Sequence, residues 1–210
     1  MLIELWHIFI EDGIVLIIEH LQLVGVAVLS AIIIAVPLGI LLSRDFMRKY
    51  NHKIIAFFNI AQGLPSLVII ALILPLLGVG FLPAVTALTI YALLPIVRNT
   101  MAGLNGVQPD VVEAALGMGM TPLQVLYKIE IPLAFPVIIA GIQTAAVISV
   151  GTAVVSNLIG AGGLGQMIFT GLAMFDSSKI LLGSLLSALI AIIIDQLFEI
   201  LKYRLKVIQY

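Results

Sequence analysis

Long runs of apolar residues alternate with short polar segments along most of the chain. A membrane-spanning helix needs about 20 apolar residues to cross a hydrocarbon core of roughly 30 Å. Five runs approach or exceed this length, and the shortest of them can be extended at both ends. The pattern therefore predicts an all-α integral membrane protein with five spanning helices, at residues 21–42, 54–78, 82–97, 133–158 and 180–201.

The second run is interrupted by Gln62-Gly63-Leu64-Pro65. If the run were split at Pro65, each piece would have about half the length that a span requires. Proline bends membrane helices more often than it ends them. One kinked helix is therefore predicted, with two separate pieces as the alternative.

The composition supports a membrane setting. Hydrophobic residues make up 62% of the 210 residues and charged residues 10%, and the mean hydropathy is +1.25. These values lie far from those of soluble domains. The absence of cysteine excludes disulfides, thiol catalysis and cysteine metal sites. The three histidines are scattered, so no metal site is expected, and a net charge of −1 gives no reason to expect nucleic acid.

The positive charges predict the orientation. With five spans, nine of the ten Lys and Arg residues fall on one side and only Lys179 on the other. Such a bias marks the cytoplasmic side. The N-terminus is therefore expected on the outer side of the inner membrane and the C-terminus on its cytoplasmic side. Residues 1–19, which lack a basic signal-peptide region, are expected to form an external amphipathic segment. Residues 20–202 then form the membrane domain and 203–210 a cytoplasmic tail.

The only sizeable cytoplasmic loop is residues 101–131. Pro109 suits the first turn of a short helix that ends at Gly117 or Gly119. Thr121 and Gln124 form a T-x-x-Q capping box for a second helix. Two short helices at an angle are predicted to make a compact knob. A plain solvated hairpin, with Glu113 as a helix-start acid, is the simpler interpretation.

A specific spacing in this loop favours more than a hairpin. The pattern E-A-A-x3-G-x9-I-x-x-P runs through Glu113, Ala114, Ala115, Gly119, Ile129 and Pro132. It resembles the EAA loop of ABC-importer permeases, although Ile131 stands where that family usually has Leu. The resemblance implies a type I permease fold whose loop docks on an ATPase subunit. ATP and Mg²⁺ would then be bound by that partner, and the chain itself would hold no cofactor and be no enzyme.

Further segments narrow the resemblance. Residues 61–67, 94–100, 129–140 and 159–165 are similar to permeases of osmoprotectant importers, which carry glycine betaine, carnitine, choline and related amines. The likeness covers about residues 20–200. It implies an extracytoplasmic binding protein and a second permease subunit, identical or related. Methionine-importer permeases share the plan but match less well, so a methionine or amino-acid importer is the alternative.

Several residues are candidates for the solute path. Ser149, Thr152 and Ser156 share one face of the fourth span, and either helix packing or a hydroxyl-lined path explains them. Gln62 interrupts the second span. A glycine-rich segment follows the fourth span and lacks the G-K-[ST] ending of a phosphate loop. It is expected to form a tight turn with a role at the outer gate, through Gly160, Gly162, Gly163 and Gly165.

Two charged residues lie within or at the ends of spans. Asp195 is an intramembrane acid, functional by default, but pairing with Lys202 about 10 Å along the helix is the favoured interpretation. Arg98 is read as a positive-inside anchor. The spans contain no Trp, so an aromatic cage for a quaternary amine is not expected. A secondary transporter would need central ion-binding carboxylates and an intramembrane enzyme a catalytic set, and the spans supply neither.

Overall fold

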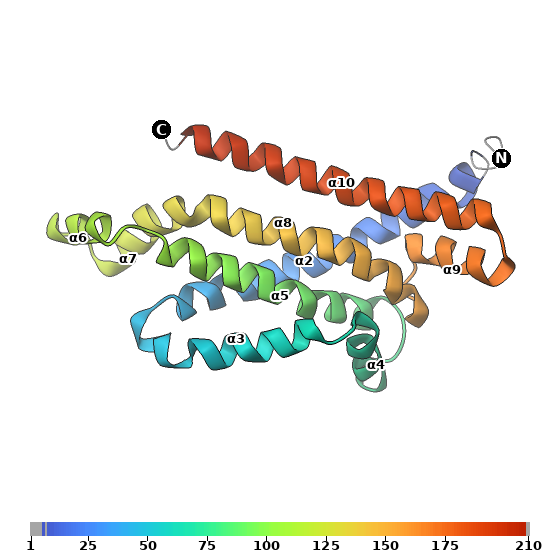
Figure 1. The fold of residues 1–210 in the computed structure, drawn as a ribbon, viewed down its shortest axis with the longest axis horizontal. Coiled ribbons are helices and arrows are strands. Elements are labelled where there is room, and N and C mark those ends of the chain that lie inside the picture. Colours follow the sequence, from blue (N-terminus) through green and yellow to red (C-terminus); the bar gives the residue numbers. More distant parts are fainter. Residues whose placement is uncertain (1–5, 7, 209–210) are drawn as a thin grey trace.

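The computed structural model describes residues 6 and 8–208, and every regular element among them is a helix (Figure 1). Nine α-helices form an elongated bundle, joined by π turns at Phe9–Gly13 and Leu126–Glu130 and 3₁₀ turns at Asp45–Met47 and Ser156–Ile159. The α-helices are α2 (Ile14–Leu42), α3 (Arg48–Gly63), α4 (Ser66–Leu77), α5 (Phe81–Asn105), α6 (Pro109–Gly117), α7 (Pro122–Val125), α8 (Ile131–Val155), α9 (Leu164–Met174) and α10 (Ser177–Ile208).

Helix α5 is the centre of the bundle and packs along its length against α2 and α8. Small residues let these helices approach closely, as is usual in membranes. A Cβ atom on Gly39 would lie 2.6 Å from Thr100 Cβ, and one on Gly141 would lie 2.5 Å from Asn99 Cβ. Both glycines therefore mark places where α2 and α8 touch α5 too tightly for a larger side chain.

Four of the five predicted spans are helices long and apolar enough to cross a membrane. They are Phe9–Leu42, Phe81–Asn105, Pro122–Ile159 and Ser177–Arg204. The last is buried over only 11% of its most apolar window, so most of its apolar surface is free to face lipid. A fifth span exists only if the bent pair of α3 and α4 counts as one.

The prediction of a single kinked helix over residues 54–78 is wrong. Helices α3 and α4 meet at 97°, because Leu64 and Pro65 both leave helical geometry, with ψ of 140°. A residue before proline is forced out of the α region by the proline ring. The Tyr91 hydroxyl donates a hydrogen bond to the Leu64 carbonyl, which stabilises the break. The chain thus turns sharply at the position that the sequence marked only as a bend.

The first span starts earlier than predicted. The π turn Phe9–Gly13 runs directly into α2, so residues 9–19 continue the helix with no break at residue 20. Residues 1–5 and 7 of the expected external segment lie outside the described residues. At the other end α10 continues to Ile208, and residues 209–210 of the expected tail lie outside as well.

Candidate functional site

A helical knob projects from one end of the bundle, between the central helices α5 and α8 (Figure 1). It consists of α6, α7 and the π turn Leu126–Glu130, which leads into α8. The knob contains the E-A-A-x3-G-x9-I part of the pattern, and the final Pro132 follows in α8. The first predicted short helix is present as α6. The second is the beginning of the fourth span, because α7, the π turn and α8 form one continuous helix, Pro122–Ile159.

Gly119 ends α6 in a Schellman motif. Its amide donates to the carbonyl of Leu116 at 2.9 Å, and the amide of Met120 donates to the carbonyl of Ala115 at 3.2 Å. This pairing requires a left-handed residue after the helix, and Gly119 has φ of +86°. No atom lies within 4 Å of a Cβ built there. Backbone conformation rather than space is therefore the reason for a glycine at this position.

The predicted capping box opens α7. The main-chain amide of Gln124 donates to the Thr121 hydroxyl at 3.3 Å, and the main-chain amide of Thr121 donates to the Gln124 side-chain oxygen at 2.9 Å. Pro122 occupies the first helical position, and Pro132 lies in the first turn of α8. The two turns of the knob are thus fixed by local sequence.

The motif residues differ in exposure. Glu113, Ala114 and Gly119 are exposed on the knob, whereas Ala115 is buried and Ile129 is half-buried at its base. Exposed apolar side chains surround them, namely Val111, Leu116, Met118, Leu123 and Tyr127. A projecting surface that combines apolar side chains with two exposed acids, Asp110 and Glu113, is suited to contact with another protein.

An ion pair that the sequence analysis missed ties the base of the knob to α2. The Arg44 guanidinium lies 2.8 Å from the Glu130 carboxylate. Glu130 is buried, in the middle of the Ile129–Ile131 stretch. The contact joins the end of the first long helix to the start of α8. An acid between two isoleucines, Ile129 and Ile131, was the available sequence signal.

The predicted glycine turn forms at the opposite end of the bundle. Gly160, Gly162 and Gly163 all have positive φ, between +72° and +80°. Gly165 has an ordinary φ, but a Cβ there would overlap the carbonyl oxygen of Val154. The four glycines are therefore needed for two different reasons, three for backbone conformation and one for close approach.

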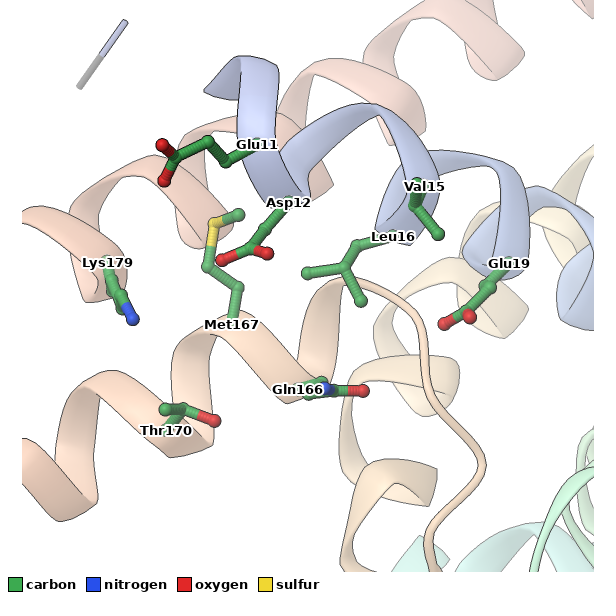
Figure 2. Close-up of a pocket in the computed structure, with 9 residues that line it drawn as sticks. All are labelled: Glu11, Asp12, Val15, Leu16, Glu19, Gln166, Met167, Thr170 and Lys179. Atoms are coloured by element: carbon green, nitrogen blue, oxygen red, sulfur yellow. The ribbon is translucent and has the colours of Figure 1, made fainter. Parts of the chain in front are cut away.

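This glycine turn is docked on α2. The amide of Gly163 donates to the Glu19 carboxylate at 2.9 Å, and the same glycine packs against His20, which is fully buried. Beside it lies a cavity of about 280 Å³ (Figure 2). Acidic side chains from the N-terminal helix face Thr170 of α9 across it, with Lys179 near its edge. Neither the contact nor the cavity was predictable from local sequence, because Glu19 and Gly163 lie far apart in the chain.

The hydroxyl face of α8 points into the bundle. Ser149 and Ser156 are fully buried and Thr152 nearly so. The Thr152 and Ser156 hydroxyls donate to carbonyls of their own helix. These three side chains therefore line no surface that a solute can reach in this conformation. Of the two explanations left open for them, the structure favours helix packing.

Gln62 is half-exposed at the end of α3. Asn59, three residues earlier, accepts a hydrogen bond from the Arg98 guanidinium at 2.5 Å. Both partners are exposed. Arg98 therefore connects α5 to α3.

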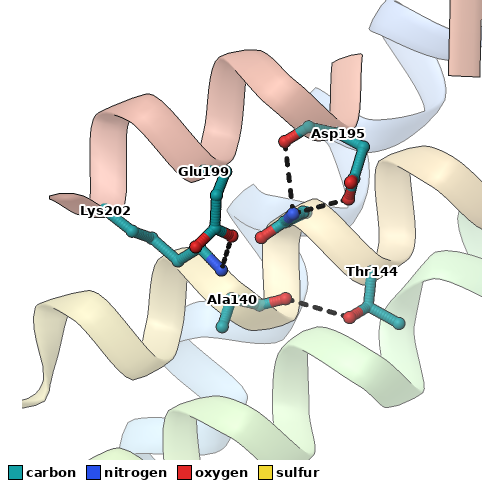
Figure 3. Close-up of polar contacts among 6 residues, drawn as sticks. Ala140, Thr144, Asp195, Glu199 and Lys202 are labelled. Atoms are coloured by element: carbon teal, nitrogen blue, oxygen red, sulfur yellow. Dashed lines mark hydrogen bonds and ion pairs between the residues drawn. The ribbon is translucent and has the colours of Figure 1, made fainter. Parts of the chain in front are cut away.

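Asp195 does not pair with Lys202. The Gln143 side-chain amide donates to the Asp195 carboxylate at 2.6 Å and to its main-chain carbonyl at 3.2 Å (Figure 3). Lys202 instead pairs with Glu199 at 2.6 Å. Lys202 is seven residues from Asp195 but only three from Glu199. Residues three apart lie on the same side of a helix, so the Glu199 carboxylate is the nearer partner.

No group of three metal-ligating side chains occurs among the described residues.

Comparison with known proteins identifies relatives over most of the chain. Residues 35–207 match the family described as "Binding-protein-dependent transport system inner membrane component". The glycine betaine/carnitine/choline transport system permease protein OpuCB of Bacillus subtilis is 45% identical, over 87% of this chain and 83% of its own. The choline transport system permease protein OpuBB of the same organism is 43% identical, over 89% and 85%. The osmoprotectant import permease protein OsmY of Salmonella typhimurium is 42% identical, over 85% and 76%.

Solved structures share the fold. A chain of the inward-facing MetNI methionine ABC transporter superposes with a TM-score of 0.82, over 89% of this chain and 93% of that one, at 22% identity. A chain of an amino acid ABC transporter solved with histidines gives 0.77, over 97% and 96%, at 19% identity. At these identities the similarity establishes the arrangement of helices and leaves the solute open.

Proposed function

Because the chain belongs to the family of binding-protein-dependent transport system inner membrane components, we propose that it is the permease subunit of an ATP-driven importer for a quaternary-amine osmoprotectant. The observation that carries the proposal is 42–45% identity to osmoprotectant, carnitine and choline permeases over at least 85% of the chain. The solute is of the glycine betaine, carnitine or choline type.

The knob is the coupling element. It carries Glu113, Ala114, Ala115 and Gly119 between two central helices, with Ile129 and Pro132 at its base. Its exposed apolar side chains suit the groove of an ATPase subunit, which binds ATP and Mg²⁺ and hydrolyses the ATP. Motion of the knob reaches the bundle through α8 and through the Arg44–Glu130 ion pair. The knob end faces the cytoplasm, and α3 with α4 forms the fifth, broken span.

The opposite end faces outward and receives solute from an extracytoplasmic binding protein. The glycine turn of Gly160, Gly162, Gly163 and Gly165, held on α2 by Glu19, forms part of the outer gate. The path runs between this chain and a second permease subunit within the lipid membrane. Gln62, on the half-exposed end of α3, contributes to it. The buried hydroxyls of α8 stay inside the subunit and support its packing.

A methionine or amino-acid importer is the alternative solute assignment. The two solved structures with the same fold come from such importers, but at 19–22% identity they support the helix arrangement and no particular solute. Sequence identity to the amine permeases is about twice as high. The quaternary-amine assignment is therefore favoured.

The coupling role is tested by co-purification with the ATPase. Leu123 is 64% exposed on the knob, and a buried Leu stabilises an interface by about 1.5–3 kcal/mol. Leu123→Asp should therefore reduce the ATPase recovered with the tagged permease at least about tenfold. Phe175→Asp, at a residue 93% exposed at the other end of the bundle, is the matched control and should leave recovery unchanged. Equal recovery with both variants would exclude the knob as the docking surface.

A further inference from the structure

The inner half of α10 carries an acid without a cationic partner among the described residues. Asp195 lies within the Ser177–Arg204 span, about 10 Å along the helix from Lys202. Lys202 is engaged by Glu199 and leaves the Asp195 charge uncompensated (Figure 3). An ionisable side chain at this depth is costly in lipid. It therefore has to face protein or a solute path.

A cavity of about 350 Å³ opens beside Asp195, between α8 and α10. Polar side chains line it at Gln143, Thr144, Asp195 and Lys202, and Val147 and Ile148 form an apolar wall. The volume falls in the range of small-molecule sites. The cavity thus combines the Asp195 carboxylate and apolar surface with a lysine that is already paired with Glu199.

Gln143 holds the carboxylate in place. Its side chain is nearly buried, and its amide nitrogen donates to both Asp195 Oδ1 and the Asp195 main-chain carbonyl. Oδ2 makes no hydrogen bond within the described part of the chain. One carboxylate oxygen is therefore anchored to protein, and the other is available to a ligand.

We propose that Asp195 is the counter-ion for the ammonium group of the solute as it passes the inner half of the membrane. The inference rests on the proposed function and adds the contact inside the permease. A trimethylammonium group has no N–H to donate, so charge and methyl contacts attract it. Asp195 supplies the charge, and Val147 with Ile148 supplies apolar surface for the methyl groups. A single carboxylate without an aromatic cage binds weakly enough for the solute to leave.

The first test uses thiol chemistry, for which the cysteine-free chain gives no background. Thr144→Cys places an exposed thiol on the cavity wall of the permease–ATPase complex in lipid nanodiscs. A methanethiosulfonate bearing a trimethylammonium group should react with it at least about tenfold faster than the sulfonate analogue, after correction for bulk reactivity. Adding Asp195→Asn should abolish this preference. Asp45→Asn, the same change at an exposed site in the Asp45–Met47 turn, should keep it within about twofold.

Asp195→Glu separates charge from packing. It keeps the carboxylate and should keep most of the preference for the cationic reagent. Loss of the preference in both the Asn and the Glu variants would indicate a packing role and overturn the proposal. So would equal preferences in the Asp195→Asn and Asp45→Asn proteins.

The second test measures ATP-driven uptake of glycine betaine, carnitine and choline by complexes reconstituted with the binding protein. Asp195→Asn should lower amine uptake about tenfold relative to Asp45→Asn, at equal complex recovery. Equal uptake by the two variants would overturn the Asp195 assignment alone. If the unaltered complex imported none of these amines, the proposed function would fail, whatever the thiol reaction shows.

Discussion

Replacing Gly119 tests whether the shape of the knob governs coupling. A Cβ at this position meets no atom within 4 Å, so a substitution adds no clash and its cost is purely conformational. The left-handed backbone, at φ of +86°, costs an L-residue about 1–2 kcal/mol. Because 1.4 kcal/mol corresponds to a factor of ten, Gly119→Ala should lower the equilibrium constant for forming the native turn severalfold to about thirtyfold.

Gly117 provides the matched control. It is exposed, also has no atom within 4 Å of a built Cβ, and has no positive φ. Gly117→Ala should therefore be neutral or slightly favourable for the helix. At position 119 the defect should increase in the order Asn, Ala, Val, because Asn tolerates the left-handed region and a β-branched residue does not.

The assay is ATP hydrolysis stimulated by the solute-loaded binding protein, measured in proteoliposomes that contain equal amounts of permease. Gly119→Val should lose most of this stimulation while the protein stays in the membrane. Gly119→Ala should lose less, and Gly117→Ala should match the unaltered chain. If the two alanine variants had the same activity, the Schellman turn would have no part in coupling.

Three further predictions concern topology and the contacts that position the knob and the glycine turn. Single cysteines can replace Asn105 and Phe175, which are both exposed. An impermeant thiol reagent added outside should label position 175 and spare position 105, and the reverse result would invert the orientation. Arg44→Gln should lower the free energy of unfolding by about 1–3 kcal/mol, measured by thermal unfolding, because it leaves the Glu130 carboxylate buried and unpaired. A double-mutant cycle with Glu130→Gln should give a clear coupling energy. Gly165→Ala should lower the free energy of unfolding by at least about 1–3 kcal/mol, because the added Cβ overlaps the backbone. A lower yield of monodisperse protein would show this, and an unchanged yield and melting temperature would contradict the packing described.

Local sequence was enough to predict the features that depend on contacts between residues close together in the chain. The T-x-x-Q box at Thr121 and the glycine end of α6 at Gly119 form as expected, because caps and turns involve neighbours in the chain. Four apolar runs became long helices for the same reason. The break at Pro65 was underestimated, since its size depends on the Tyr91 contact from another helix.

Contacts between distant residues could not be predicted. The Glu19–Gly163 hydrogen bond joins residues 144 positions apart, and the Gln143–Asp195 hydrogen bond joins residues 52 positions apart. Both depend on how the helices align after packing. Likewise the shared hydroxyl face of α8, which contains Ser149, was evident from helical spacing. Whether this face points into the subunit or into a solute path is decided only by the position of α2 and α5.

Uptake by purified components shows whether the permease carries a quaternary amine. Proteoliposomes containing the permease and its ATPase, with ATP inside, would be supplied with labelled glycine betaine, carnitine, choline or methionine, with and without the binding protein. We expect ATP-dependent accumulation of at least one quaternary amine, only when the binding protein is present, and none of methionine. Accumulation of methionine but of none of the amines would contradict the assignment and favour an amino-acid importer.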